Sequence, residues 1–272
     1  MIILAVLSNG SCKSFGSFSK LVMVERSKRR METVTLFFWA REFDNTYNYG
    51  MELTMHPDRS VFFANLLMPP GEVLHHWDSR GETISLPLLQ PDRLYHFSLH
   101  GITAPDQMYT QVVFLNDADQ TIDHQEFPDH AGDIKLPDQA TNYRVQLMNI
   151  HQQGTDFRYG ILLPADLAAN SSISVTLETG IIWVRTTEVA TGQDLVLVAN
   201  RFAALSIPVD AGQPTVAVFA APTDAQIEEL TKTLQPSLPI RLRVYGSGLN
   251  QWADQLRTRL SSCFLFQTNG GQ

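Results

Sequence analysis

Short runs of residues with high β-propensity recur along the chain from Met31 onward, and turn residues separate them. In the first half the runs cover residues 33–39, 51–55, 60–67, 72–77, 93–101, 109–116, 142–150 and 156–163. Gly, Pro, Asp and Asn gather between them, as in MPPG at 68–71 and NDAD at 116–119. Strands separated by such turns predict an all-β domain, an antiparallel β-sandwich or jelly roll.

Two of these runs alternate between polar and apolar residues. Within residues 93–101, one face of the strand carries Leu94, His96, Ser98 and His100, and the other carries Tyr95, Phe97 and Leu99. Residues 142–150 alternate in the same way, with Tyr143, Val145 and Leu147 on one face. One wet face and one buried face is typical of a strand in an antiparallel sheet.

The second half of the chain predicts more strands and then helices. Residues 162–173 suggest a linker or domain edge, and strands are expected at 172–178, 180–186, 194–200, 204–209, 215–221 and 241–248. One helix is expected to open at Thr223-Asp224, and another near Asn250, because Trp252, Leu256 and Leu260 share one helical face. We therefore predict a β-sandwich over residues 31–165 and a C-terminal β-rich extension with one or two helices over residues 166–272.

The first thirty residues differ from the rest. They hold six Lys or Arg and one Glu, although the whole chain of 272 residues has a formal net charge of -8. The apolar run MIILAVL is too short to span a membrane, and the basic residues follow it, whereas a secretory signal has them first. We interpret residues 1–30 as a flexible or mis-assigned leader with Met31 as the true start. The alternative is that the basic stretch at 27–30 contacts a membrane surface.

The charge and the cysteine content exclude several classes of protein. A pI near 5.4 is unlike that of a general nucleic-acid binder, which shows a basic face. Cys12 and Cys263 lie near opposite ends, so there is neither a paired zinc spacing nor a disulfide framework. This cysteine usage fits a reducing cytosol.

Two adjacent histidines, His75 and His76, are the strongest suggestion of a metal or catalytic site. In a strand, however, neighbouring side chains point to opposite faces, so both cannot bind one ion. His96 and His100 share a face but lie roughly 13 Å apart at the β-strand rise. We therefore predict no metal and no cofactor. A metal-dependent hydrolase that uses His75 or His76 remains a third hypothesis.

The motifs of covalent catalysis and phosphate binding are missing. The sequence contains no G-x-S-x-G, no Walker A lysine and no G-x-G-x-x-G. The segment NDADQT lacks the glycine and the terminal glutamate of a calcium loop, so a tight hairpin turn is expected there. We predict that the chain has no catalytic residues and is not an enzyme.

Aromatic residues on a sheet face offer another route to function. Trp77, Tyr95, Tyr109 and Tyr143 lie in predicted strands, where they would stack on sugar rings or grip an extended peptide. The alternative is that these side chains fill the core.

From Trp39 to about Leu163 the sequence resembles a known family, the third of the three accessory Sec system proteins of streptococci, staphylococci and lactobacilli. The matching segments occur in the order TYNYGMEL (46–53), VFFANLLMPPGEVLHHWDS (61–79), LPLL (86–89) before a Tyr-containing strand, YTQVVFLND (109–117) and NYRVQLMNIHQQGTDFRYGILL (142–163). The sequence departs from the family at NIHQQG, where members commonly have Asn-Ala-Gly after the last strand.

The resemblance implies a non-catalytic subunit with a β-sandwich like that of a carbohydrate-binding module. It implies work with the other two accessory Sec proteins and with the dedicated Sec ATPase motor. Together these would bind an O-glycosylated serine-rich-repeat adhesin and support its export. The expected location is the cytoplasm or the inner face of the cell membrane, with at most peripheral membrane contact and no nucleic acid.

The resemblance also suggests where to look for contacts. The candidate contact residues are Asn65, Trp77, Tyr95 and Tyr143, and Asn65 and Trp77 flank the MPPG turn as either structural corners or contact anchors. The alternative function is a free-standing carbohydrate-binding module, or the remnant of a glycan-processing enzyme.

Overall fold

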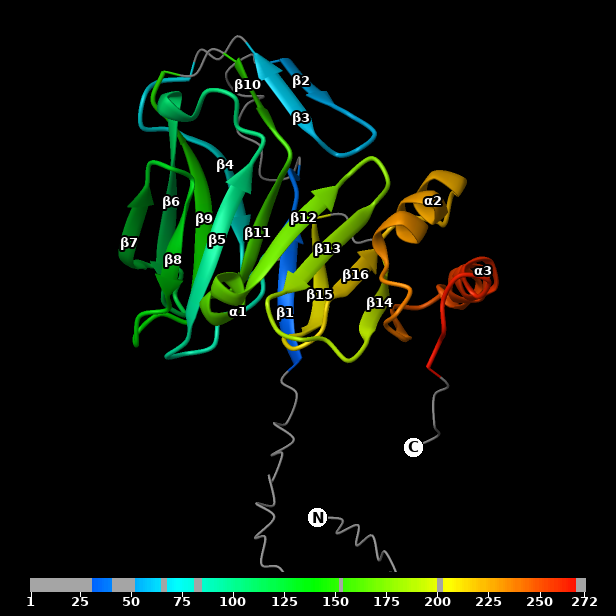
Figure 1. Ribbon diagram of the computed structural model, residues 1–272. Coiled ribbons are helices and arrows are strands. Elements are labelled where there is room, and N and C mark those ends of the chain that lie inside the picture. The colour runs from blue at the N-terminus through cyan, green and yellow to red at the C-terminus, as the bar shows by residue number, and fades with distance from the viewer. Residues whose placement is uncertain are drawn as a thin grey trace, which may run out of the picture.

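The computed structural model describes residues 31–40, 52–64, 68–80, 85–151, 154–199 and 203–267. Within these ranges four β-sheets and two longer helices are stacked in layers (Figure 1). The leader over residues 1–30 and the candidate contact residue Asn65 lie outside the described residues, so those two predictions stay predictions.

A five-stranded antiparallel sheet, here called the central sheet, lies in the middle of the stack. Its strands in spatial order are β15 (Ala204–Asp210), β1 (Met31–Phe37), β11 (Tyr159–Pro164), β5 (Leu94–His100) and β8 (Ala131–Lys135). β1 pairs with β15 over seven residues on one side and with β11 on the other. The central sheet therefore joins segments from both halves of the chain.

A second antiparallel sheet, here called the outer sheet, packs on one face of the central sheet. Its strands in order are β4 (Val73–Asp78), β9 (Asn142–Asn149), β6 (Met108–Leu115) and β7 (Thr121–Phe127). A 3-10 turn at Pro105–Gln107 leads into β6. The alternating apolar residues of both sheets, such as Phe97, Leu99, Val112 and Val145, fill the space between them. This pair of sheets is the sandwich that the sequence predicts.

A small three-stranded sheet, here called the cap sheet, closes one end of the sandwich (top of Figure 1). Its strands are β10 (Gly154–Phe157), β3 (Val61–Ala64) and β2 (Glu52–Met55). Phe63 and Phe157 point from it into the sandwich core, where their rings lie 5.2 Å and 5.7 Å from the ring of Trp39.

A third layer, here called the helix-backed sheet, packs on the other face of the central sheet. Its strands in order are β12 (Ser171–Thr176), β13 (Ile181–Thr186), β16 (Thr215–Val218), β14 (Gln193–Val198) and β17 (Ile240–Tyr245). β14 runs parallel to both of its neighbours, whereas the other pairs are antiparallel. Val34 and Ile161 of the central sheet pack with Val184 and Val196 in a second core between the layers.

Two helices cover the far face of the helix-backed sheet. They are α2 (Asp224–Thr233) and α3 (Asn250–Leu260), and Leu230 and Leu256 bury their apolar faces against the sheet. Thr223 caps α2 through a capping box with Gln226, which satisfies donors that the first turn would leave unpaired. A shorter helix, α1 (Ala165–Asn170), lies between β11 and β12.

The prediction of a mainly β chain with two C-terminal helices is confirmed, and so is the hairpin turn at 116–121. There the backbone N–H of Asn116 donates to Gln120, and the side-chain oxygen of Asn116 accepts from the N–H groups of Ala118 and Gln120. The sequence pattern did not predict β7, β8 or α1. The boundary between residues 165 and 166 stays a prediction, and β15 returns to the central sheet from beyond it.

Candidate functional site

The two adjacent histidines point in different directions, as their place on one strand predicts. His75 is fully buried and its ring stacks on Trp39, with centroids 4.1 Å apart and planes 15° from parallel. His76 faces the outer surface, where its Nε2 lies 3.2 Å from a carboxylate oxygen of Asp78. Among the described residues, no group of three His, Cys, Asp or Glu is arranged to hold a metal ion.

Three of the predicted contact residues lie in the sandwich core. Trp77 is fully buried, and its indole N–H donates to the carbonyl oxygen of Phe38 at 2.7 Å. Tyr143 is 1% exposed and donates to Pro87, 2.8 Å away. Burial also raises the pKa of Tyr143 well above its ordinary value. These placements favour the alternative that the aromatic residues fill the core.

Tyr95 is buried as well, on the inner face of β5. Its hydroxyl oxygen accepts a hydrogen bond from the backbone N–H of Gln90, and the guanidinium of Arg93 lies 5.7 Å from its ring centre. Tyr109, the fourth aromatic residue of the sequence pattern, differs from the other three because it is half-buried on the outer face of β6. Burial and the nearby Glu126 both raise the pKa of the Tyr109 hydroxyl.

The outer face of the outer sheet carries a row of polar side chains, here called the polar rung. Direct strand partners share a sheet face, so the register places four side chains in line across all four strands. They are His76, Gln146, Gln111 and Glu126. Imidazole, amide and carboxylate groups supply both donors and acceptors, which suits a ligand rich in hydroxyl or amide groups.

A shallow depression of about 280 Å³ lies beside the polar rung, between the rung and the β6–β7 turn. Arg144 and His124 line it together with Gln111 and Gln146 of the rung. The guanidinium of Arg144 lies 2.5 Å from Asp78. Burial raises the pKa of Asp78, but the hydrogen bonds from His76 and Arg144 outweigh this effect, so the pKa ends below its ordinary value.

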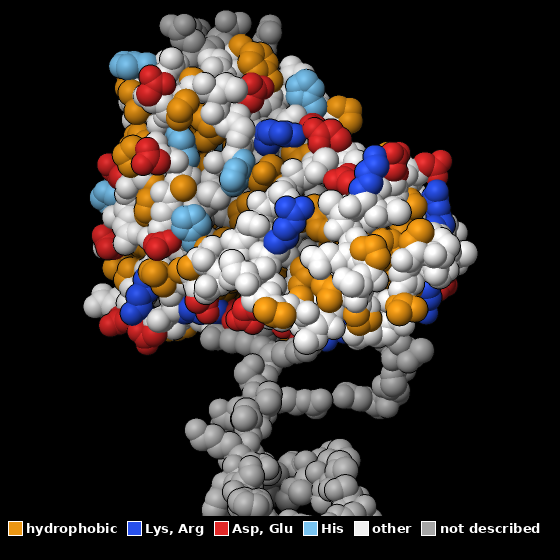
Figure 2. Space-filling model, in the orientation of Figure 1, with side chains coloured by type: hydrophobic (Ala, Val, Ile, Leu, Met, Phe, Trp, Pro, Cys, Tyr) orange, Lys and Arg blue, Asp and Glu red, His pale blue; other side chains and the backbone are white. Residues whose placement is uncertain are grey.

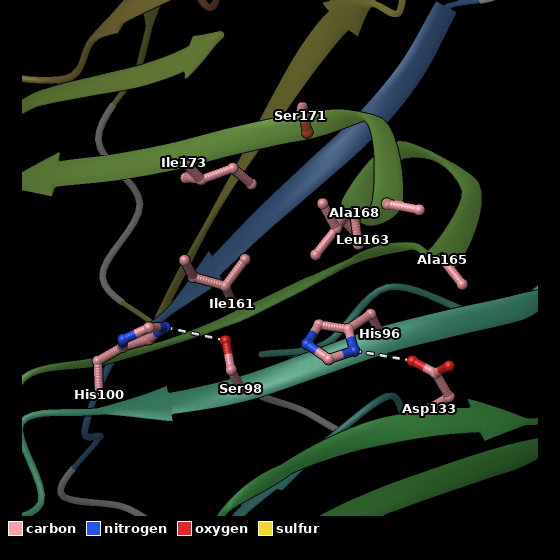
Figure 3. Close-up of a pocket in the computed structure, with 11 residues that line it drawn as sticks. His96, Ser98, His100, Asp133, Ile161, Leu163, Ala165, Ala168, Ser171 and Ile173 are labelled. Atoms are coloured by element: carbon pink, nitrogen blue, oxygen red, sulfur yellow. Dashed lines mark hydrogen bonds and ion pairs between the residues drawn. The ribbon is translucent and has the colours of Figure 1, made fainter. Parts of the chain in front are cut away.

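A larger groove, of about 410 Å³, lies where the helix-backed sheet stops short of the edge of the central sheet (Figure 3). Its floor is the outer face of β5 and β11, including Ser98 and Ile161, and its wall is made by α1 and β12, including Ala168 and Ile173. A volume in this range is typical of ligand pockets. We refer to this site as the α1–β12 groove.

Two polar pairs lie along the floor of the α1–β12 groove. Nδ1 of His96 lies 2.7 Å from Oδ1 of Asp133, and Oγ of Ser98 lies 2.9 Å from Nε2 of His100 (Figure 3). The ring of His100 also stacks on Tyr159, with centroids 4.7 Å apart. Burial lowers the pKa of His100, and the neighbouring His96 lowers it further.

These pairs do not assemble a hydrolytic triad. In a triad one histidine contacts both the serine and the carboxylate, so that the carboxylate orients the ring and stabilises its charge. Here Ser98 contacts His100, whereas Asp133 contacts His96. Both pairs place hydrogen-bonding groups on the floor of the groove, where they can contact a ligand.

The sequence pattern gave only a partial signal for the α1–β12 groove. It placed His96, Ser98 and His100 on one face of a strand, but it assigned the wall residues 165–173 to a linker or domain edge.

In Figure 2, histidines are visible over the sandwich half of this face of the molecule. No described helix is both long enough and apolar enough to cross a membrane.

Comparison with known proteins finds relatives that are similar to part of the chain. The chain is 25% identical over 121 residues to the accessory Sec system protein ASP3 of Streptococcus gordonii, which covers 42% of this chain and 76% of that protein. It is 26% identical over 129 residues to the ASP3 protein of Staphylococcus aureus, which covers 44% of this chain and only 40% of that protein.

A solved structure and a family model are also similar to parts of the chain. A chain in the crystal structure of accessory secretory proteins 1, 2 and 3 of Streptococcus pneumoniae is 25% identical, with a TM-score of 0.44, over 47% of this chain and 94% of that one. The model of the family described as accessory Sec secretory system ASP3 matches residues 46–163, which contain strands β2 to β10 and all of β11 except Pro164. The sequence of residues 46–163 is therefore similar to the accessory Sec secretory system ASP3 family.

Proposed function

We propose that the protein is a non-catalytic subunit of the accessory Sec system that acts in protein export. With the other two accessory Sec proteins and the dedicated Sec ATPase motor, it binds an O-glycosylated serine-rich-repeat adhesin and keeps it competent for export. The observation that carries this proposal is the family match over residues 46–163. The site of action is the cytoplasm, with at most peripheral contact with the inner face of the membrane.

The placement of the family-matching residues supports a scaffold role. Ser79 and Tyr143 exchange two hydrogen bonds of 2.8 Å between side chain and backbone, and both residues are buried. In the same interior, the indole N–H of Trp77 donates to the carbonyl oxygen of Phe38, the residue that follows β1. Since these residues maintain the sandwich, the exposed face of the outer sheet is left to contact partners.

Co-purification from the native host tests this proposal. The full chain, carrying an affinity tag, is expected to retain the two partner accessory proteins and the motor ATPase, and a deletion strain is expected to lose adhesin export. Binding to none of these proteins, together with unimpaired export in the deletion strain, would refute it. The full chain is required because β15 completes the central sheet, so a fragment that ends at residue 163 would leave β1 without one of its partners.

A second candidate function, direct carbohydrate binding, is favoured by the polar rung. Sugar hydroxyls pair well with planar polar side chains, and an aromatic ring beside them supplies a stacking surface. Tyr109 lies on the same outer face as the rung, since its strand position is two residues from Gln111. Trp77 and Tyr95 are buried, so neither can stack on a sugar ring at the surface. Tyr109 is the aromatic residue proposed for this role.

Calorimetry with N-acetylglucosamine and with glucosylated peptides tests the second candidate. Tyr109→Ala is expected to weaken binding about tenfold, a loss that corresponds to about 1.4 kcal/mol of stacking energy. The matched control is Tyr245→Ala, because Tyr245 is 38% exposed on β17, a strand of the helix-backed sheet. Equal affinities for the two variants, or no heat of binding for the unaltered protein, would exclude this function for the rung.

A further inference from the structure

The edge strand β12 differs from every other edge strand in the described part of the chain. Four sheets have two edges each, and seven of the eight edge strands carry at least one charged residue. These residues are Asp210 in β15, Lys135 in β8, Asp156 in β10, Glu52 in β2, Arg241 in β17, Asp78 in β4 and Glu126 in β7. β12 has the sequence SSISVT, with no charge, no proline and no glycine.

Proteins normally protect an edge strand because its unpaired backbone groups pair readily with another strand. Charges, prolines and bulges are the usual protection, and they occur on the other edges of this molecule. β12 pairs with β13 without a register shift over six residues, and among the described residues no strand pairs with its other edge. This edge is therefore ready to accept a further strand.

The free edge of β12 borders the α1–β12 groove. In Figure 1, β13 lies on one side of β12, and β11 and β5 of the central sheet lie on the other. Ser171 and Ile173, which alternate along β12, line the groove together with residues of β5. A strand added to this edge would run along the groove, with alternate side chains directed toward its floor.

The lining of the groove selects the kind of side chain that fits. The wall carries small residues, Ala165, Ala168 and Ala169, which leave room beside β12 for the side chains of an added strand. Among the described residues that line the groove, Asp133 alone bears a charge at neutral pH when histidines are neutral, and it is paired with His96. An acidic side chain would lose hydration over Ile161 without gaining an opposite charge. Ser98 and His100 offer hydrogen bonds to a hydroxyl group.

We propose that the free edge of β12 binds an extended, uncharged peptide segment that carries hydroxyl side chains, as an added strand whose alternate side chains enter the α1–β12 groove. The backbone of the peptide would supply affinity through strand pairing, and the groove would supply selectivity for uncharged side chains with a hydroxyl group. This inference deepens the proposed function, since it gives a serine-rich export substrate a specific site. The site lies partly in residues 165–173, beyond the family match, which ends at residue 163.

A binding assay with the full chain and synthetic peptides tests the inference. The probe is a short Ser/Thr/Ala peptide with acetylated and amidated ends, and its counterpart has glutamate at every second position. The neutral peptide is expected to bind at least about tenfold more tightly than the acidic one, since charged side chains would be desolvated against the groove floor. Equal binding of the two peptides would overturn the inference.

Ala169→Glu is the matching protein variant, because Ala169 is an exposed residue of α1 that lines the groove. It is expected to weaken binding of the neutral peptide about tenfold without loss of folding. The control is Ala118→Glu, the same substitution at an exposed alanine in the β6–β7 turn. An equal effect of the two substitutions would contradict the proposed location.

Amide hydrogen exchange measures whether the peptide pairs with β12 as a strand. Addition of the neutral peptide is expected to slow exchange at backbone amides of β12, and an unchanged β12 would exclude an added strand. Sedimentation at the assay concentration identifies a competing occupant. If β12 amides are already protected in a dimer that Ala169→Glu dissociates, a second copy of the chain occupies the edge and the inference is wrong.

The outcome also separates this inference from the proposed function. A protein that retains the accessory partners but binds no neutral peptide would refute the β12 site alone. A protein that binds neither the partners nor the peptide would refute both. Peptide binding that is lost in Ala169→Glu, while partner binding persists, is the result that the inference predicts.

Discussion

The side-chain amide of Asn149 donates to the carbonyl oxygen of Met68 at 2.8 Å, across the MPPG turn of the sandwich. The same nitrogen lies 3.2 Å from the carbonyl oxygen of Pro69, and the backbone oxygen of Asn149 accepts from Gly71. Gly71 has a φ of 85°, a region that favours glycine. One buried asparagine at the end of β9 therefore holds the turn that leads into β4.

Asn149→Ala is expected to lower the free energy of unfolding by about 1–3 kcal/mol, since it removes donors from buried carbonyl groups of the turn. Urea unfolding measures this change. Asn149→Asp is expected to cost more, because a carboxylate would face two carbonyl oxygens that it cannot pair with. Gln120→Ala is the control, because it removes an exposed side-chain amide. It is expected to change the free energy of unfolding by no more than about 0.5 kcal/mol. If Asn149→Ala behaves like Gln120→Ala, the amide does not hold the turn.

Arg241 links the helix-backed sheet to the central sheet. Its guanidinium lies 2.7 Å from Asp194 of β14 and 3.0 Å from Asp210 of β15, and both carboxylates have side chains only 2% exposed. Arg241→Met is expected to destabilise the fold by about 3–5 kcal/mol, because it removes the guanidinium that pairs with both buried carboxylates. Addition of Asp210→Asn to this variant is expected to restore part of the loss in thermal unfolding. If the double variant loses more stability than the two single variants lose together, the result would contradict this coupling.

His130 gives the fold a predictable dependence on pH. Its Nε2 lies 3.1 Å from the carbonyl oxygen of Pro105, and its Nδ1 lies 2.9 Å from the hydroxyl of Thr110. Since a carbonyl only accepts, Nε2 carries the proton and Nδ1 accepts from Thr110, which defines the neutral ring. Burial lowers the pKa of His130, although the bond to Pro105 and the nearby Asp129 oppose this effect.

The stability contributed by the neutral His130 ring is fully present above the ordinary histidine pKa of 6.5. As the pH falls below that value the unfolded chain binds a proton that the folded chain excludes, so the free energy of unfolding declines until the lowered pKa is passed. His130→Asn is expected to reduce this slope, and asparagine tolerates the φ of 56° at this position. Urea unfolding on both sides of pH 6.5 measures it, with the exposed His124→Asn as a control. Identical slopes in both variants would contradict the assignment.

Gly160 allows β11 to pass close to Phe37. A Cβ at this position would overlap the Phe37 ring, since the glycine faces it directly across the β1–β11 pair. Gly160→Ala is expected to cost about 1–3 kcal/mol, as overpacking of a filled core does. Phe37→Leu in the same chain is expected to recover part of this loss. Additive losses in the double variant, measured by thermal unfolding, would show that the two side chains do not compete for the same space.

The hydrophobic patterns predict most strands, but not the pairing between sheets. Within residues 93–101 the alternation correctly separates Phe97, which is buried, from Ser98, which faces the groove. β7, with the sequence TIDHQEF, is an outer edge strand with partly or fully exposed residues along its length, so it lacks the apolar alternation that marks a strand. β8 is short and contains Gly132, which packs under the ring of Phe127.

The α1–β12 groove was not predictable for a related reason. It is assembled from β5, β8, β11, α1 and β12, whose residues span positions 96 to 173, and only the packing of the two sheets brings them together. An alternation pattern shows that Tyr95 and Tyr143 share faces with apolar residues, but not whether another layer covers those faces. Their burial depends on the outer and central sheets packing against each other.

The position of β15 beside β1 has a consequence for synthesis on the ribosome. β1 is among the first described strands to emerge, yet its seven-residue partner ends at Asp210. The central sheet therefore stays incomplete while most of the chain is translated, and one edge of β1 has no partner strand during that interval. Long-range pairing of this kind slows folding and leaves strand edges exposed to misassembly. The nascent chain thus has a period of vulnerability whose end is set by the release of residues 204–210.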